Sequence, residues 1–317
     1  MELVDLRGVG ALLLGLIFSG CVNAADVVPW LYEVAVPVTS QSVEERQRAS
    51  GEALLKMLTR LTGLAYVPRT PEVREALDAA EPYYSEFRFS SNPVDGLVLI
   101  VQFDSEPVLD LVRVAGLPIW RTSREKVLVW VVVQDKGERT LIGATSESAL
   151  VAGLESRALD RGIPLTLPLL DLEDQLAVEA AAVLGRLSQV IDPASRRYGA
   201  DVLLLGRVVP DLQNGWHSDW EFWVDGMVVP FTADGSDLTE HAVHAVDVLS
   251  NELAGRRMVH GGVAGQLRIA VNGIETPVDY GALLGYLRGL EFVDAVNVVE
   301  IRGARLWLTL QTTAKPA

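Results

Sequence analysis

The chain has 317 residues, of which 49% are apolar and 22% charged, and its formal net charge is −15. This length and composition suit two or three compact domains with sizeable cores and exclude an intrinsically disordered chain. Nucleic-acid binders cluster Lys and Arg to neutralise phosphates, whereas this sequence has no basic stripe and an overall negative charge. We therefore expect no nucleic-acid partner.

Residues 1–24 have the form of a secretory signal peptide. The apolar run "GVGALLLGLIFSG" is too short to span a bilayer and follows a short segment that contains Arg7. The small residues of "VNA" favour cleavage before Ala25, which would release a soluble periplasmic protein. The competing reading takes "FSGC" as a lipobox and leaves Cys21 lipidated, so that the protein is anchored to a membrane as a lipoprotein.

Cys21 is the only cysteine, so the sequence excludes an intramolecular disulfide. No later segment has the roughly 18 unbroken apolar residues of a transmembrane helix. We expect no membrane span once the signal peptide is removed.

The first unit is expected over residues 26–120. "WLYEVAVPV" predicts a strand, and the next segment predicts a helix that begins with a Ser42–Glu45 capping box and ends at Gly63. A second helix begins after Thr70. "FRFSSNPVDGLVLIVQF" predicts two strands around a turn, and "EPVLDLVRVAG" predicts a short helix. The order is strand, two helices, two strands, helix.

A central domain is expected over residues 124–258. "KVLVWVVVQ" is typical of a strand buried on both faces, and a helix capped by Ser146 should follow it. "IPLTLPLL" predicts a second strand, and "AVEAAAVLG" belongs to a helical stretch that begins at the acids after that strand. "YGADVLLLGRVV" and "GWHSDWEFWVDGMVVPF" predict three more strands, and "LTEHAVHAVDVLSNELAG" predicts the closing helix.

A small β-α-β-β unit is expected over residues 266–313, after a linker "GRRMVHGGVAGQ". "QLRIAVNGI" predicts its first strand, "TPVDYGALLGYLRG" its helix and "VDAVNVVEIRGARLWLTLQ" a hairpin. The chain as a whole is therefore expected to be α/β to α+β. A mixed sheet with flanking helices should form the central domain, between small mixed N-terminal and C-terminal units.

Several of these segments, in this order, resemble one bacterial family. They are "LYEVAVPV", "ALLKMLTRLTG", "AGLPIW", "VLVWVVVQD", "RGIPLTLPLLDLEDQ", "YGADVLLLGRV" and "WHSDW". The family is catalogued as domain of unknown function 2066, and the resemblance implies a secreted envelope protein without an established activity. The central segments are also similar to small α/β domains of periplasmic accessory proteins that act by binding partners, which is an analogy of fold only.

The stretch "PLTLPLLDLEDQL" places Asp171, Glu173 and Asp174 directly after an apolar run. As the N-cap of a helix, Asp171 would accept a backbone N–H bond while the other two acids complement the helix dipole. The same acids could form a ligand or partner surface, because open α/β sheets bind ligands beyond the ends of their strands. Catalysis or a hard cation is a third reading, although the spacing is not that of an EF-hand loop.

Standard catalytic and metal-binding motifs are absent. His241 and His244 are three residues apart on the closing helix, where we expect a solvated flank, and zinc would need a third ligand. There is no HExxH, GxSxG, P-loop or dinucleotide fingerprint. We expect no cofactor, no metal and no catalytic residue.

Tryptophans are concentrated in the stretch "GWHSDWEFW". Trp216 and Trp220 should share one strand face, and His217, Asp219, Glu221 and Trp223 the other. Buried, the first pair is simply core. Exposed, it would serve as an anchor for a protein or glycan, as Trp and Arg do at interfaces.

These patterns predict a periplasmic accessory or scaffold protein that binds an envelope protein partner and is not an enzyme. The residues of the hypothetical binding patch are Arg161, Asp171, Asp174, Trp216 and Trp220. One alternative is an envelope hydrolase that uses Asp171 or Asp174 as acid or base. Another is a small-molecule binding module in the crevice above the central sheet.

Overall fold

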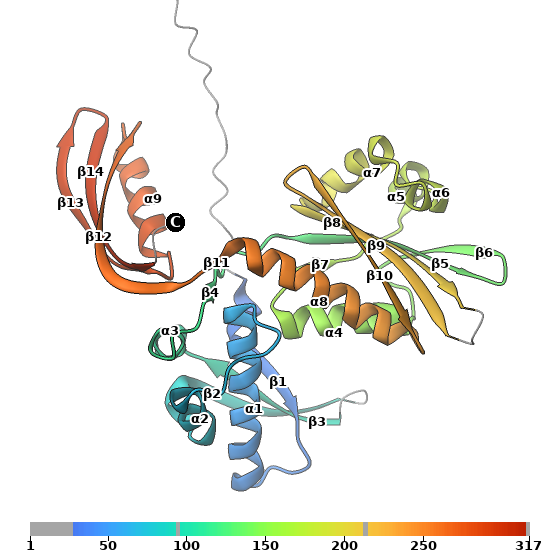
Figure 1. Ribbon diagram of the computed structural model, residues 1–317, viewed down its shortest axis with the longest axis horizontal. Helices are drawn as coiled ribbons and strands as arrows, with labels where there is room; N and C mark the ends of the chain where they lie inside the picture. The colour runs from blue at the N-terminus through green and yellow to red at the C-terminus, as the bar shows by residue number, and fades with distance from the viewer. Residues whose placement is uncertain (1–27, 93–95, 212–214, 315–317) are drawn as a thin grey trace, which may run out of the picture.

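The computed structural model describes residues 28–92, 96–211 and 215–314. The predicted signal peptide and Cys21 lie outside these residues. Helices and strands build three units, each with its own sheet and apolar core, and the predicted α+β class is confirmed (Figure 1). No helix within the described residues is long and apolar enough to cross a membrane.

The N-terminal unit is a three-stranded antiparallel sheet, in the order β1-β3-β2, with helices packed on it. The predicted order of strand, two helices, two strands and helix is confirmed. Ser42 caps the first helix by accepting a hydrogen bond from Glu45 N at 3.2 Å, and Gly63 ends it with a φ of 69°. The elements are η1 (Pro29–Tyr32), β1 (Glu33–Pro37), α1 (Val43–Thr62), α2 (Pro71–Asp78), η2 (Glu81–Tyr83), β2 (Tyr84–Asn92), β3 (Gly96–Phe103) and α3 (Ser105–Val114).

The central domain contains a mixed six-stranded sheet with helices on both faces. Its strand order is β10-β9-β8-β5-β6, with β7 also paired to β5, and β5 runs parallel to β7 and β8. The elements are β5 (Val127–Asp135), β6 (Glu138–Ile142), α4 (Ala149–Arg161), β7 (Leu165–Thr166), α5 (Leu172–Ala177), α6 (Ala180–Leu184), α7 (Ser188–Ser195), η3 (Arg196–Tyr198), β8 (Val202–Pro210), β9 (Trp216–Val224), β10 (Met227–Gly235) and α8 (Leu238–Arg257).

Alternate residues of β5 enter two different cores, which confirms that this strand is buried on both faces. Val127, Val129 and Val131 belong to the core beneath α4 and α8, whereas Leu128 and Trp130 belong to the core beneath α6 and α7. This alternation follows from the two-residue period of a strand and explains the unbroken apolar run.

Three local predictions for the central domain are wrong. Ser148, not Ser146, caps α4 by accepting a hydrogen bond from Leu150 N, while Ser146 closes a turn. The strand expected over 163–170 has only two residues, since Pro164 and Pro168 cannot donate to a ladder. The helical stretch after the acids is divided, because Val178 adopts an extended conformation between α5 and α6.

The C-terminal unit is a three-stranded antiparallel sheet, in the order β12-β14-β13, with one helix packed on one face. Its first strand begins at Gly261, inside the segment expected to be a linker. The elements are β12 (Gly261–Asn272), α9 (Pro277–Arg288), β13 (Val293–Arg302) and β14 (Arg305–Ala314). The chain passes from one unit to the next twice, and each connection contains a two-residue strand. These strands, β4 (Ile119–Trp120) and β11 (Met258–Val259), pair with each other in antiparallel orientation.

Candidate functional site: an acidic cleft between the terminal units

Asp171 caps α5, as the capping interpretation predicted. Its carboxylate accepts a hydrogen bond from Asp174 N at 3.0 Å. Arg197, which follows α7, donates to both carboxylate oxygens of Asp171 at 2.9 and 2.7 Å. These hydrogen bonds lower the pKa of Asp171 to about 2. A carboxyl group with this pKa is ionised at neutral pH and is a poor general acid.

Asp174 is buried beside this cap and accepts bonds from several directions. It is 1% exposed and accepts hydrogen bonds from Leu170 N at 2.9 Å and from the Tyr198 hydroxyl. Arg197 lies 3.2 Å from its other oxygen. A buried carboxylate with these donors holds the loop before α5 to the segment after α7.

Arg161 lies at the junction between the N-terminal unit and the central domain, and its side chain is fully buried. It donates hydrogen bonds to Gly63 O at 3.1 Å, to Asn251 Oδ1 at 2.7 Å and to Asp247 Oδ1 at 2.6 Å. These acceptors lie at the end of α1 and on α8, so Arg161 ties two units together.

The two tryptophans of the hypothetical patch lie on the helix-covered face of β9. Trp220 is 1% exposed and stacks on Phe231, and Trp216 is half-buried against the same core. The predicted sharing of a strand face by Trp216 and Trp220 is confirmed by the burial pattern of β9. The structure brings Asp171 and Asp174 together but places Arg161 and Trp220 in the interior at other positions.

His241 and His244 do not form the solvated pair that the sequence predicts. His241 is 1% exposed, and its Nδ1 lies 2.6 Å from the Ser218 hydroxyl, whereas His244 is exposed. Burial lowers the pKa of His241. Ser218 is itself fully buried, so this Ser–His pair offers no accessible nucleophile. The described residues contain no group of three His, Cys, Asp or Glu side chains that could hold a metal.

A cavity of about 540 Å³ lies against β9 and β10 of the central sheet. Arg186, Glu221 and Trp223 are among its lining residues. The Glu221 carboxylate already accepts a hydrogen bond from Trp223 Nε1 at 2.8 Å and faces Arg186 Nε at 3.7 Å. Small-molecule binding above the central sheet stays a prediction.

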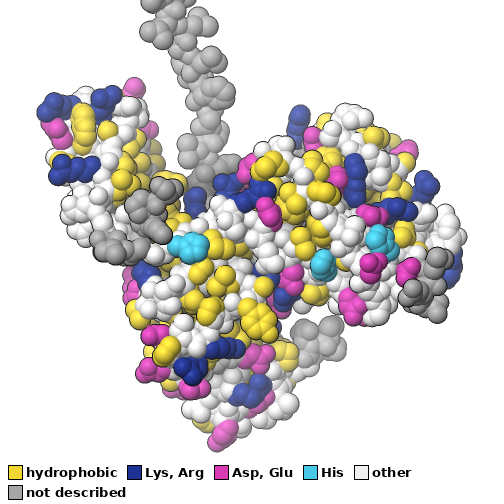
Figure 2. Space-filling view, in the orientation of Figure 1, with side chains coloured by type: hydrophobic (Ala, Val, Ile, Leu, Met, Phe, Trp, Pro, Cys, Tyr) yellow, Lys and Arg dark blue, Asp and Glu magenta, His cyan; other side chains and the backbone are white. Residues whose placement is uncertain are grey.

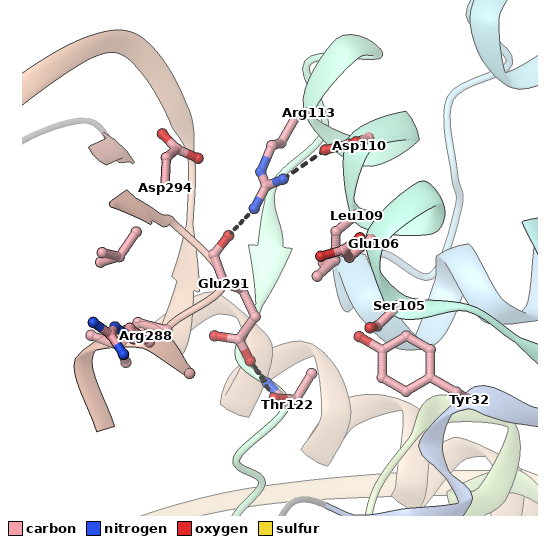
Figure 3. A pocket seen from close by; sticks show the side chains of 13 residues that line it. Tyr32, Ser105, Glu106, Leu109, Asp110, Arg113, Thr122, Arg288, Glu291 and Asp294 are labelled. Atoms are coloured by element: carbon pink, nitrogen blue, oxygen red, sulfur yellow. Dashed lines mark hydrogen bonds and ion pairs between the residues drawn. The ribbon is translucent and has the colours of Figure 1, made fainter. Parts of the chain in front are cut away.

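A larger cleft, of about 600 Å³, lies between the N-terminal and C-terminal units (Figure 3). One wall is α3 with Tyr32, and the other is the end of α9 with the loop that leads into β13. We name it the acidic cleft, because its charged lining consists of four carboxylates and two guanidiniums: Glu106, Asp110, Glu291, Asp294, Arg113 and Arg288.

Glu291 joins the two walls of the acidic cleft. Its side chain is 9% exposed and accepts hydrogen bonds from the backbone N–H of Thr122, at 2.6 Å, and from the Thr122 hydroxyl. Arg113 of α3 donates to the Glu291 carbonyl oxygen at 2.6 Å and to Asp110 at 2.8 Å (Figure 3). These bonds hold the C-terminal unit against the N-terminal unit.

Buried aromatic and cationic groups support this junction. Arg124 stacks on the ring of Trp120, 3.6 Å from its centroid, and donates to Arg60 O at 2.6 Å. Burial lowers the pKa of Arg124 to about 9, against the opposing effect of Glu291. Burial, followed by the charge of Glu291, raises the pKa of Tyr32 to about 12, so the Tyr32 hydroxyl in the cleft stays protonated.

Glu106 and Asp294 are exposed carboxylates on opposite walls of the acidic cleft, and neither makes an ion pair within the described part of the chain (Figure 3). The guanidinium of Arg288, which also lines the cleft, is exposed and makes no ion pair there either. Leu109 and Val293 add apolar surface beside these charges. Acids outnumber cations four to two in the lining, and apolar side chains lie beside them, so the cleft suits a cationic ligand with an apolar neighbour.

Sequence reasoning missed this cleft because its walls come from distant segments. Tyr32, residues 105–122 and residues 288–294 meet only when two separate units pack together. Glu106 and Asp110 lie in a short helix without any motif, and Glu291 follows a helix end without one. No local signal in the sequence marks these residues as neighbours.

The comparisons with known proteins concern the N-terminal unit most directly. A family model described as a domain of unknown function, DUF8605, matches residues 25–121. The resemblance to domain of unknown function 2066 is therefore wrong, since the matching family is a different one and the match ends before the central segments on which the resemblance rested. Alternating strands and helices of this kind recur in many unrelated folds.

A comparison with curated proteins finds no match. Among solved structures, the chain is similar to the LpoB C-terminal domain from Salmonella enterica, with a TM-score of 0.24 and 16% sequence identity. That similarity covers 35% of this chain and 80% of the other. At this TM-score it supports no inference about fold or function.

Proposed function

We propose that the protein is an exported envelope accessory protein that binds a protein partner in its acidic cleft and does not catalyse a reaction. The observation that carries the proposal is the pair of exposed carboxylates, Glu106 and Asp294, that make no ion pair within the described residues and lie on opposite walls of a cleft in which acids outnumber cations. A partner segment with Lys or Arg beside an apolar side chain would complement these carboxylates together with Leu109 and Val293.

The state of the other carboxylates supports binding over hydrolysis. Asp171 and Asp174, the candidate acid and base, serve as hydrogen-bond acceptors for backbone N–H groups, Arg197 and Tyr198. A general acid needs a pKa near the working pH, whereas the pKa of Asp171 is lowered to about 2. The predicted signal peptide supports export to the envelope.

A peptide-binding measurement with charge-neutral variants tests the proposal. Fluorescence anisotropy would compare labelled peptides of alternating Lys and Leu with peptides of alternating Glu and Leu. We expect the Lys peptide to bind, and Glu106→Gln with Asp294→Asn to weaken it about tenfold through two lost rim charges. The matched control, Glu44→Gln with Asp78→Asn, removes two exposed acids that do not line the cleft and should change nothing.

Equal binding of the two peptides would contradict the proposal. An equal loss of affinity in the cleft variant and in the control variant would contradict it as well, because the effect would then follow from net charge alone.

A further inference from the structure

The β13–β14 hairpin ends at the far side of the C-terminal unit from the acidic cleft. β13 runs from the cleft at Asp294 to Arg302 beside the turn, a distance of about 30 Å for an extended strand of this length. The turn projects away from the other two units (Figure 1), and arginine side chains lie at this end of the molecule together with acidic ones (Figure 2). We name this end the hairpin tip, defined by residues 298–307.

Two arginines of the hairpin tip lie directly opposite each other. Arg302 and Arg305 are cross-strand partners on either side of the turn, an arrangement that like charges disfavour. Each guanidinium lies near the Trp307 ring, with its carbon 5.8 and 5.6 Å from the ring centroid. Their Nε groups bond to Glu300 and Asn272, and their terminal nitrogens have no acceptor within the described residues.

The arginines and the tryptophan share one open face of the sheet. Leu306, Leu308 and Leu310 point toward α9, so the residues between them in β14 point to the uncovered side. Arg268 on β12 lies on that side too, opposite Thr309. This face carries three arginines and Glu300, which is the cross-strand partner of Trp307, on a chain whose formal net charge is −15.

Aliphatic side chains are exposed at the same tip. Val299 is 63% exposed and Ile301 is 60% exposed. The pairing of β13 with β14 shifts register between Val298 and Glu300, so the ladder is irregular just before the turn. Ile301 is the cross-strand partner of Leu306, so it lies on the α9 side of the hairpin, whereas Arg302 and Arg305 lie on the open face. The tip therefore has aliphatic side chains together with arginines and a tryptophan around its end, which matches the chemistry of a membrane interface. There, aliphatic groups enter the acyl boundary, Trp lies at headgroup level and Arg binds phosphate.

We propose that the hairpin tip docks on a bilayer surface that contains anionic phospholipid. The acidic remainder of the protein is repelled by such a surface, so the arginine-bearing tip is the part that approaches within a Debye length, about 8 Å at physiological salt. The acidic cleft then lies at the opposite end of β13, open to a partner. This inference does not rest on partner binding in the cleft, and either proposal can fail without the other.

Vesicle cosedimentation with the full chain tests the docking. The vesicles contain phosphatidylcholine alone or with phosphatidylglycerol, and all variants share one amino terminus, so any contribution from that terminus cancels. We expect phosphatidylglycerol to strengthen binding, and Arg302→Gln with Arg305→Gln to weaken it at least tenfold on those vesicles. Ile301→Ser should weaken binding to a smaller extent. The matched control, Arg74→Gln with Arg139→Gln, removes two exposed arginines elsewhere and should bind as the unaltered chain does.

Three results would overturn the docking proposal. The first is equal binding to both kinds of vesicle, and the second is unchanged binding of the Arg302/Arg305 variant while its circular dichroism and melting temperature match those of the control. The third is release of the protein from the vesicles by inorganic phosphate or by oligoglutamate. That result would identify a small anion or an acidic peptide as the occupant instead.

Discussion

Asp171 caps α5 and Asp174 lies in its first turn, and their surroundings give them different roles. Asp171 is partly exposed and forms a two-bond ion pair with Arg197. Salt and water screen an ion pair at this exposure. Asp174 is 1% exposed and accepts hydrogen bonds from Leu170 N and the Tyr198 hydroxyl. Removing a buried acceptor leaves its donors unpaired, which costs more than removing a solvated one.

Substitution by Asn should distinguish the contributions of these two carboxylates to stability. We expect Asp174→Asn to lower the free energy of unfolding by about 2 kcal/mol, because the amide cannot satisfy all the donors around it. Asp171→Asn should cost less than about 1 kcal/mol, since Asn also caps helices well. Urea denaturation of both variants measures the difference. Equal losses would show that the buried contacts of Asp174 are not stabilising.

The ion pair between Asp171 and Arg197 also predicts that the free energy of unfolding depends on pH. The pKa of Asp171 is lowered from 3.8 to about 2 in the folded protein. The folded state therefore gains stability from this group above the unfolded pKa, and loses it as the pH falls from 3.8 toward 2. The difference in unfolding free energy between the unaltered protein and Asp171→Asn should narrow across that window. A difference that stays constant down to pH 2 would contradict a stabilising ion pair between Asp171 and Arg197.

At the scale of elements, local patterns in the sequence predict the structure where one signal acts alone. The unbroken apolar run of β5 and the caps of α1 and α5 follow from period and capping chemistry. The prediction fails where signals compete. Pro164 and Pro168 interrupt an apolar run, and their carbonyl oxygens instead accept hydrogen bonds from Val127 N and Ala144 N.

The contact between β8 and β9 depends on a glycine opposite a tryptophan. A Cβ atom at Gly206 would lie 2.3 Å from the Trp220 ring, and Gly206 and Trp220 are cross-strand partners. Gly206→Ala should therefore lower the free energy of unfolding by about 2 kcal/mol through overpacking. Combined with Trp220→Leu, the added cost of Gly206→Ala should largely disappear in a double-mutant cycle measured by urea denaturation. Strictly additive losses would contradict the close contact.

At the scale of the whole molecule, the sequence does not indicate which surfaces meet. Helical and strand periods predict the elements within each unit, but the hypothetical patch joined residues that the fold keeps apart. Arg161 is buried between α1 and α8, and Trp220 is in the central core. The acidic cleft forms where α3 meets residues 288–294, through Thr122 and Arg113 bound to Glu291.

The central claim is that charge on the walls of the acidic cleft selects the partner segment. Reversing that charge, with Glu106→Lys and Asp294→Lys in one chain, tests the claim most directly. Fluorescence anisotropy would titrate this variant with the Lys–Leu and Glu–Leu peptides, and its melting temperature would verify that it folds. The account predicts that the preference inverts, so that the variant binds the Glu–Leu peptide more tightly. A folded variant that still prefers the Lys–Leu peptide would contradict it.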